Sequence, residues 1–343
     1  MNASLESAHL AADPQPAAEV ALFAVGEALW APSVHNTQPW WFCPAGRSVS
    51  LHADAGRQLM TADPDGREML ISCGAALFTM RLALRSLGYV PRTKVLPDPA
   101  QPLLIAEVSW SERAAATGYE QRLFEQIRRR RTHRGGFDTL PLSPDLLAAL
   151  HESARRDGAA LHVVSDEGRK AALGALVETA ERSLRLDPRY VRELADWTTP
   201  PGQERPDGVP ATAYPARAER TEPHFPGRDF AHGHGWGLPP ASWAHGRSAG
   251  VVALLATAGD ERTDWVNAGQ ALQRLLLLST ACGVAAAIHS QPLEIRWLRT
   301  VLRAQIADGC HPQLLLRLGT VTQAGASVRR ALDEVIRPGG KQG

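Results

Sequence analysis

The chain is poor in cysteine and lysine, and it lacks long apolar runs. Its four cysteines are scattered over 343 residues without a C-x-x-C pair, which argues against a zinc ribbon or a redox dithiol and fits a reducing compartment. The N-terminal segment MNASLESAHLAADPQP lacks the basic and apolar regions of a signal peptide. The longest apolar run, at positions 275–288, is too short and too interrupted to span a bilayer. We therefore expect a soluble, cytoplasmic protein.

The charge balance has no excess of either sign. The formal net charge is +1, so composition favours neither a nucleic acid nor an anionic membrane as a partner. Only three of the 37 basic residues are lysine, and arginine is the residue suited to bidentate phosphate binding. Hydrophobic residues make up 44% and charged residues 21% of the chain, as in ordinary globular proteins of one large or two ordinary domains.

Two stretches of the chain resemble each other. Apolar residues at three- and four-residue spacing predict a helix over residues 66–87 and another over 264–283. Each contains a Gly-x-Ala-Leu step and ends, at the same interval from that glycine, at a second glycine suited to the left-handed position after a helix. The glycine pairs are Gly74 with Gly88 and Gly269 with Gly283. A chance similarity of two amphipathic helices is the alternative to duplication.

The flanking segments repeat as well. A buried strand is expected after each helix, at 102–110 and 312–320, and a helix end, a loop and a strand before it, at 26–42 and 147–164. The sequence therefore predicts an α+β fold of two fused copies, residues 1–117 and residues 118–343.

The second copy carries a long insertion, residues 197–245. Loops of this length in compact domains are usually functional or disordered, and the aromatic residues here argue against disorder. Those aromatics are Tyr214, Phe225, Phe230, Trp236 and Trp243. We interpret the insertion as a lid over a cavity. His232 and His234 are close together in it, but no metal site is predicted. Trp265 and Trp297, on amphipathic helices, are expected in the core.

The segment APSVHNTQPWWF, residues 31–42, concentrates polar and aromatic groups in one turn. Hydroxyl, amide and backbone N–H groups on a rigid turn can bind the edge of a planar heterocycle. The alternative is purely structural: a helix C-cap followed by a buried tryptophan pair.

Arginines gather in RRRRTHRGGF, residues 128–137. Arginines beside a threonine hydroxyl and glycine N–H groups can form a phosphate cradle, whereas Arg128 and Arg129 are expected to be a solvated helix end. A second pair, Arg329 and Arg330, occurs in SVRRALDEVI; by itself it is typical of a surface pair.

These motifs together resemble a known family. A-P-S-x-x-N-x-Q-P-W is similar to the signature of the nitroreductase family of FMN-dependent oxidoreductases, R-R-T-x-R resembles its R-R-S-x-R element, and the late arginine pair resembles its C-terminal phosphate contact. The duplicated chain with an insertion is similar to the Acg-type branch. Family members are homodimers with FMN at the subunit interface, so the resemblance implies a nitroreductase-like fold and a single-chain pseudo-dimer.

The resemblance also implies one composite FMN site per chain. Residues 152–161 lack the Pro-Ser, Asn and Gln-Pro of the turn, and the first half has no arginine or lysine before Arg47. The phosphate and ribityl chain would contact Arg130, Thr132, Arg134, Arg329 and Arg330. The flavin ring would contact Pro32, Ser33, Val34 and Asn36, with Gln38 supporting the turn, and backbone or side chains at Gly283, Val284, His289 and Ser290.

The implied reaction is hydride transfer from NAD(P)H through FMN to a nitroaromatic, quinone or similar small-molecule electron acceptor. The flavin carries the chemistry, so no catalytic side chain is predicted. A protein that sequesters FMN beneath the lid with little turnover is the alternative. The chain is expected to act as a monomer, with further dimerisation left open.

Overall fold

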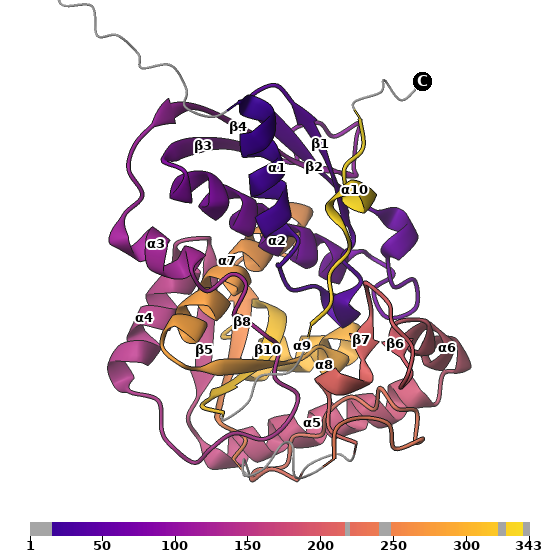
Figure 1. The fold of residues 1–343 in the computed structure, drawn as a ribbon. Helices are drawn as coiled ribbons and strands as arrows, with labels where there is room; N and C mark the ends of the chain where they lie inside the picture. Colours follow the sequence, from indigo (N-terminus) through magenta and orange to yellow (C-terminus); the bar gives the residue numbers. More distant parts are fainter. Residues whose placement is uncertain (1–15, 217–219, 240–247, 322–326, 339–343) are drawn as a thin grey trace, which may run out of the picture.

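Two four-stranded antiparallel sheets enclose a central pair of helices in the computed structural model (Figure 1). The structure describes residues 16–216, 220–239, 248–321 and 327–338. The first sheet has the strand order β1-β2-β4-β3 and the second β5-β8-β10-β9. Counted along the chain among the strands of each sheet, both orders are first-second-fourth-third. The shared topology confirms the predicted α+β fold and its two-copy, pseudo-dimeric architecture.

The elements follow the sequence pattern closely. The first half contains α1 (Ala17–Ala28), η1 (Val34–Asn36), β1 (Trp40–Ala45), β2 (Ser48–Ala53), η2 (Ala55–Arg57), α2 (Arg67–Ser86), β3 (Tyr89–Val95) and β4 (Leu104–Arg113). The second contains α3 (Gly118–Phe124), α4 (Pro144–Arg155), β5 (Ala159–Val164), α5 (Glu167–Arg185), α6 (Pro188–Asp196), β6 (Thr198–Thr199), β7 (Val209–Pro210), η3 (Ala211–Ala213), β8 (Val251–Thr257), α7 (Arg262–Ala281), β9 (Ala285–His289), α8 (Gln291–Glu294), α9 (Arg296–Gln305), β10 (His311–Gly319) and α10 (Leu332–Val335). The two predicted long helices are α2 and α7, and the two predicted strands after them fall on β4 and β10.

Helices α2 and α7 cross at two glycines. A Cβ atom on Gly74 would lie 2.1 Å from the carbonyl oxygen of Val266, and one on Gly269 would lie 2.0 Å from that of Ile71. Each of these carbonyls lies three residues before the glycine of its own helix, so the two contacts are reciprocal. Only residues without a side chain let the two backbones approach this closely, and the reciprocity places a local twofold axis at the crossing.

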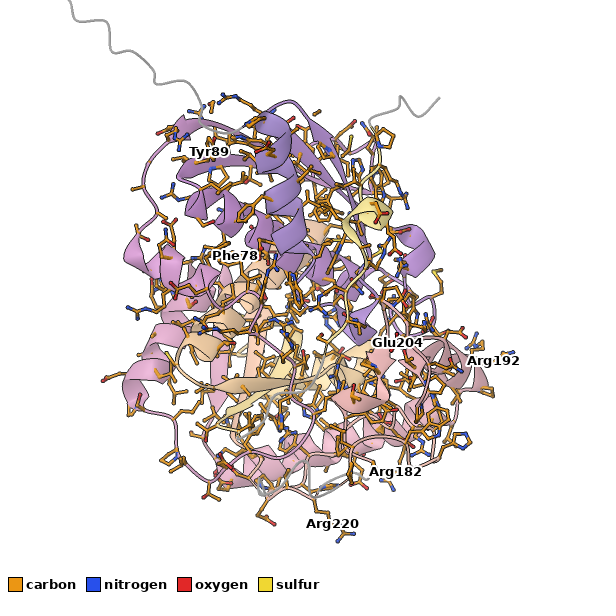
Figure 2. All side chains as sticks on the ribbon, viewed as in Figure 1. Phe78, Tyr89, Arg182, Arg192, Glu204 and Arg220 are labelled. Atoms are coloured by element: carbon orange, nitrogen blue, oxygen red, sulfur yellow. The ribbon has the colours of Figure 1, made fainter. Side chains whose placement is uncertain are left out.

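The core extends across both halves through α2. Figure 2 shows Phe78 in the middle of the molecule; it is 4% exposed and belongs to the apolar cluster of the second sheet. Among the described helices, α2 is the one long and apolar enough to cross a membrane, and most of it is buried inside the protein. The prediction for Trp297 is wrong: it is 57% exposed on α9, whose buried face is formed by Leu298 and Leu302.

The last described segment returns to the first half. In Figure 1 it runs from the lower half to β1, where the N–H of Arg337 donates to the carbonyl of Phe42 at 2.9 Å. Val335 of α10 belongs to the apolar cluster of the first sheet. Residues from the predicted second copy therefore complete the core of the first.

The described part of the insertion is packed rather than detached. Tyr214 and Phe230 join an apolar cluster that also contains Leu59 of the first half. Phe225 is 1% exposed, and a Cβ on Gly174 of α5 would lie 2.1 Å from the carbonyl of His224. Trp243 lies outside the described residues. The insertion is an integral wall of the molecule along α5.

Candidate functional site

The turn at residues 31–42 has an unusual backbone. His35, Asn36 and Gln38 have φ values of 45°, 55° and 49°, in the left-handed region that non-glycine residues seldom adopt. The hydroxyl of Ser33 accepts the N–H of Gln38 at 2.9 Å and closes the turn. Such a conformation persists only where surrounding contacts enforce it.

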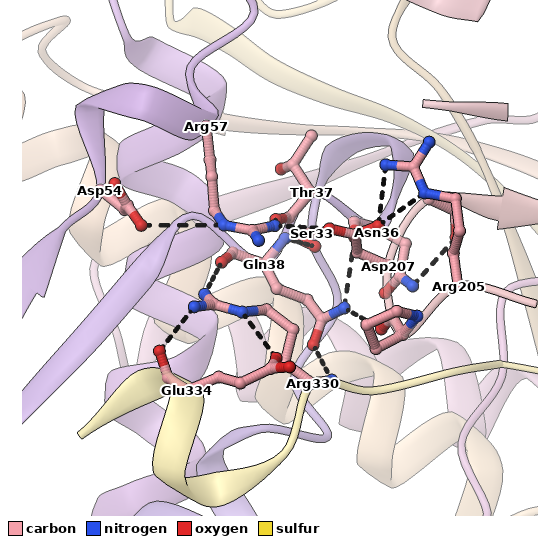
Figure 3. A network of polar contacts seen from close by, with 12 residues as sticks. Ser33, Asn36, Thr37, Gln38, Asp54, Arg57, Arg205, Asp207, Arg330 and Glu334 are labelled. Atoms are coloured by element: carbon pink, nitrogen blue, oxygen red, sulfur yellow. Dashed lines mark hydrogen bonds and ion pairs between the residues drawn. The ribbon is translucent and has the colours of Figure 1, made fainter. Parts of the chain in front are cut away.

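Those contacts come from distant parts of the chain (Figure 3). The Asn36 amide donates to the carbonyl of Gly208 at 3.0 Å. The Gln38 amide donates to the carbonyl of Pro206 at 2.9 Å, and its Oε1 accepts the N–H of Arg330 at 2.9 Å. The turn is thereby held between the insertion and the C-terminal segment. Asn36 does not line the cavity described next; its side chain holds the turn in place, and its contact with a flavin ring stays a prediction.

A cavity of about 740 Å³ opens beside this turn, within the usual size of small-molecule sites. Its walls come from the turn, α2, residues 132–135, the insertion, α5 and the end of β9. Predicted site residues that line it are Pro32, Ser33, Val34, Thr132, Arg134, His289 and Ser290. The structure therefore brings the two sequence motifs and the end of β9 to one cavity.

Arg130 is buried and Arg329 is partly buried; they lie behind Thr132 and Asn36 and do not themselves line the cavity. Arg130 is 2% exposed and donates to the hydroxyl of Thr132 at 3.5 Å. Arg329 donates to Asn36 Oδ1 at 3.1 Å and to the carbonyl of Trp30 at 3.2 Å. Neither guanidinium forms an ion pair with a described residue, and the Nε atom of each is buried without a hydrogen-bond partner there.

Burial makes this pair electrostatically unfavourable. It lowers the pKa of Arg130 to about 9, with Arg131 and Arg134 adding to the shift. Burial also lowers the pKa of Arg329 well below its usual value, helped by Arg130 and Arg131. Buried cations are normally paired, so the cluster lacks an anion among the described residues.

Arg330 is not part of this cluster. Its guanidinium donates to the carbonyls of Gln38, Trp40 and Glu334 at 3.3, 3.3 and 2.8 Å. The charges that act on it are those of another group, led by Arg57 and Asp54. Arg330 thus anchors the C-terminal segment to β1, and its part in a phosphate clamp stays a prediction.

Gly283 and Val284 lie away from the cavity. Gly283 is exposed after α7 with a φ of 72°, and Val284 is buried in the core of the second half. The chain reaches the cavity at Ala287, four positions of extended chain beyond Gly283, which is about 13 Å. Gly283 and Val284 lie at the other end of β9, so the structure does not bring them to the cavity, and the flavin contacts expected there stay a prediction.

Arg134 and Arg128 have partners of their own. Arg134 donates to the carbonyl of Ala213 at 3.2 Å and lies over the ring of Phe230; burial lowers its pKa to about 10. Arg128 is exposed, as predicted, but it also forms an ion pair with the buried carboxylate of Glu27 at 2.7 Å. Arg129 is exposed.

Sequence reasoning missed the polar groups around His289. Arg317, 2% exposed, donates from Nε to His289 Nε2 at 2.8 Å. Burial, with Arg317 and Arg228, lowers the pKa of His289 well below its usual value, so the imidazole is neutral with its proton on Nδ1. One signal was available: Arg317 is the only charged residue in the apolar strand PQLLLRLGT.

Known proteins were compared with the chain. No family model matches it. Two Mycobacterium tuberculosis proteins are named "Putative NAD(P)H nitroreductase". One is 35% identical over 94% of this chain and 92% of its own length, and the other is 31% identical over 94% of this chain and 97% of its own length. The chain belongs to the nitroreductase family. A solved FMN and NADPH-dependent nitroreductase, NfnB from sphigopyxis sp. strain HMH, covers 64% of this chain and 99% of its own at 20% identity, with a TM-score of 0.36.

The two halves of this nitroreductase-family chain differ at the turn. The segment 29–39 connects α1 to β1, but only the short segment 156–158 connects α4 to β5. The shorter connection cannot form the turn that holds Ser33 and Val34 at the cavity. The second half therefore lacks the counterpart of this wall.

Proposed function

We propose that the chain is an FMN-dependent oxidoreductase that passes a hydride from NAD(P)H, through FMN, to a nitroaromatic, a quinone or a similar acceptor. The observation that carries the proposal is the pair of Arg130 and Arg329, which have no carboxylate partner among the described residues and lie behind Thr132 of the cavity wall. A phosphate monoester supplies the anion that this pair lacks among the described residues. The relatives named as NAD(P)H nitroreductases support the same reaction class.

The donors present suit FMN. The guanidinium groups of Arg130 and Arg329, whose Nε atoms have no hydrogen-bond partner among the described residues, and the hydroxyl of Thr132 would hold the phosphate. Pro32, Ser33 and Val34 would border the ring. These residues bind and orient the cofactor, and the packed insertion excludes water from one side of it.

His289 would serve as a neutral hydrogen-bond donor to the ring or to a substrate. Its Nε2 accepts from Arg317, which leaves the Nδ1–H for a cavity ligand. The hydroxyl of Ser290 accepts from Arg228 at 3.0 Å and donates to Glu294 at 2.7 Å. These hydrogen bonds fix the cavity wall next to His289. A neutral donor stabilises developing negative charge without bringing another cation into the site.

The alternative function is FMN storage without useful turnover. It is favoured by the insertion, whose described residues from Tyr214 to Gly235 form a large part of the cavity wall. Oxidoreduction needs access for two substrates in turn, whereas storage needs the cavity closed. Adding NADPH to the flavin-loaded protein separates the two, because storage predicts no bleaching of the flavin absorbance.

The purified protein is expected to be yellow and to release one FMN per chain on denaturation. One site is expected because the loop 156–158 is too short to repeat the turn. Chromatography identifies the flavin, and absorbance against protein concentration gives the ratio. Release of FAD or heme, or a ratio near two, would overturn the assignment.

Shortening the loop at residues 232–236 should accelerate reduction of the flavin by NADPH. Gly233, His234 and Gly235 line the cavity, and His234 stacks on Trp236 with 4.9 Å between ring centroids. Replacing residues 232–236 with three glycines removes this cover but keeps the buried Tyr214 and Phe230. Stopped-flow reduction by NADPH should become about tenfold faster, equivalent to about 1.4 kcal/mol of barrier, with FMN retained.

The control for this loop is an exposed turn away from the cavity. Replacing residues 201–203 with glycines should leave the reduction rate unchanged. If wild-type reduction is already fast and both variants match it, the loop does not restrict access.

We further propose that the two halves arose by duplication with a boundary near residue 118, within the Acg-type branch. On this proposal one chain supplies both sides of the FMN site and works as a cytoplasmic monomer. Light scattering of the flavin-loaded protein tests the monomer.

A further inference from the structure

Glu68 is a buried acidic residue among those that line the cavity. It lies in the first turn of α2, is 7% exposed and lines the cavity with Ile71 and Ser72. Its Oε1 accepts from Arg67 Nη2 at 2.9 Å. Its Oε2 is buried and has no hydrogen-bond partner among the described residues. A buried carboxylate oxygen is costly to leave unpaired, whereas a protonated one can donate to a bound ligand.

Glu68 is connected through Ser72 to the turn that borders the proposed flavin site. The hydroxyl of Ser72 donates to the backbone carbonyl of Glu68 at 2.7 Å and accepts the N–H of Val34 at 3.3 Å. The carboxyl group therefore lies one helical turn from the residue that holds the ring-binding turn in place.

The surroundings of Glu68 favour its protonated form. Its pKa is raised to about 8, chiefly by burial; Glu294 of α8 and Asp63, before α2, add to the rise, while Arg67 and Arg228 oppose it. Both arginines have other partners. Arg228 binds Glu294 at 2.6 Å, and Arg67 also donates to the carbonyl of Gln313 at 2.7 Å.

We propose that Glu68 is the proton donor to the electron acceptor. The inference rests on the proposed function. The acceptor gains two electrons and one hydrogen as the hydride, and its second hydrogen is the proton from Glu68 Oε2. A quinone thus becomes a hydroquinone, and a nitro group becomes a nitroso group plus water. The Glu68 carboxylate that remains regains a proton from solvent.

The proposal fixes the pH dependence of the oxidative half-reaction. The donor is protonated below a pH of about 8 and ionises above it. Flavin oxidation by a quinone should therefore be constant below this pH and fall tenfold per pH unit above it. Flavin reduction by NADPH needs no proton from Glu68 and should not follow this profile.

Glu68→Gln is the decisive variant, because glutamine has the shape of the neutral acid and can still accept from Arg67. Stopped-flow measurements on the FMN-loaded protein should show unchanged reduction by NADPH. Oxidation by benzoquinone should be slowed about 100-fold, the usual contribution of a general acid, and its fall above pH 8 should disappear. Glu178→Gln, at an exposed carboxylate of the same cavity, should match the wild type in both half-reactions.

Infrared difference spectra report directly whether the Glu68 carboxyl group is protonated. The wild type should show a protonated-carboxyl band at pH 7 that is lost above pH 8 and is absent in Glu68→Gln. An ionised Glu68 at pH 7, or wild-type oxidation in Glu68→Gln, overturns the proton-donor role while FMN binding stands. If the wild type does not bind FMN, the proposed function is overturned instead, and the infrared band then shows only whether Glu68 is protonated.

Discussion

Replacing Arg329 with alanine is expected to weaken FMN binding by about one to two decades. A hydrogen bond to a charged group contributes about 1.5–3 kcal/mol, and about 1.4 kcal/mol corresponds to tenfold in affinity. The same change removes a buried cation that repels Arg130 and Arg131. Relief of this repulsion opposes the loss of the hydrogen bonds from Arg329 to Asn36 and Trp30, so the unfolding temperature of the apoprotein should change little while its affinity falls, which separates lost binding from lost folding.

Fluorescence quenching of added FMN measures the affinity, and calorimetry measures the unfolding of the apoprotein. Arg130→Ala should weaken FMN binding to a similar extent, because the Arg130 guanidinium belongs to the same cluster. Arg129→Ala is the matched control, since Arg129 is adjacent in sequence but exposed. Wild-type affinity in both cluster variants would refute the phosphate site.

Replacing Gly74 with alanine is expected to be strongly destabilising. The new Cβ would lie 2.1 Å from the carbonyl oxygen of Val266, and backbone cannot move aside as a flexible side chain can. Overpacking of cores costs about 1–3 kcal/mol, and this contact belongs at the upper end of that range. Gly269→Ala should cost a similar amount, because its Cβ would lie 2.0 Å from the carbonyl of Ile71.

Gly26→Ala is the control for both variants. Gly26 is also helical, in α1, but no atom lies within 4 Å of a Cβ built there. Alanine at this position should stabilise the protein by about 0.5–1 kcal/mol. Urea unfolding compares the three variants, and equal effects of Gly74→Ala and Gly26→Ala would disprove the close crossing of α2 and α7.

Local signals predicted the regular elements well. The periodic segment at 66–87 became α2, Arg67–Ser86, because apolar spacing and a following glycine are both short-range features. Gly88 and Gly283 do adopt φ values of 80° and 72°, as the predicted helix ends require. The return of the C-terminal segment to β1 was not predicted, since it depends on a contact between Arg337 and Phe42, near opposite ends of the chain.

The candidate site was predicted only in part. The motifs placed Pro32, Ser33, Val34, Thr132 and Arg134 at one cavity, although they come from different halves. They could not distinguish Arg329 from Arg330, because adjacent arginines look equivalent until their surroundings are known. They also gave no indication of Glu68, whose role depends on burial and on Glu294, which belongs to the other half of the chain.

The sequence by itself predicted the two long helices, the strands after them and their repeated order, because periodicity and glycine positions are short-range signals, and its motifs resembled those of the nitroreductase family. Only the tertiary structure decided which polar groups are unpaired. That property depends on what the rest of the chain brings to each atom: a carbonyl for Asn36, a strand for Arg330, and no described carboxylate for Arg130 or Arg329. Desolvation of a group depends on its surroundings in the folded protein and not on its residue type. The unpaired groups and the pKa shifts of this site could therefore be identified only in the folded structure.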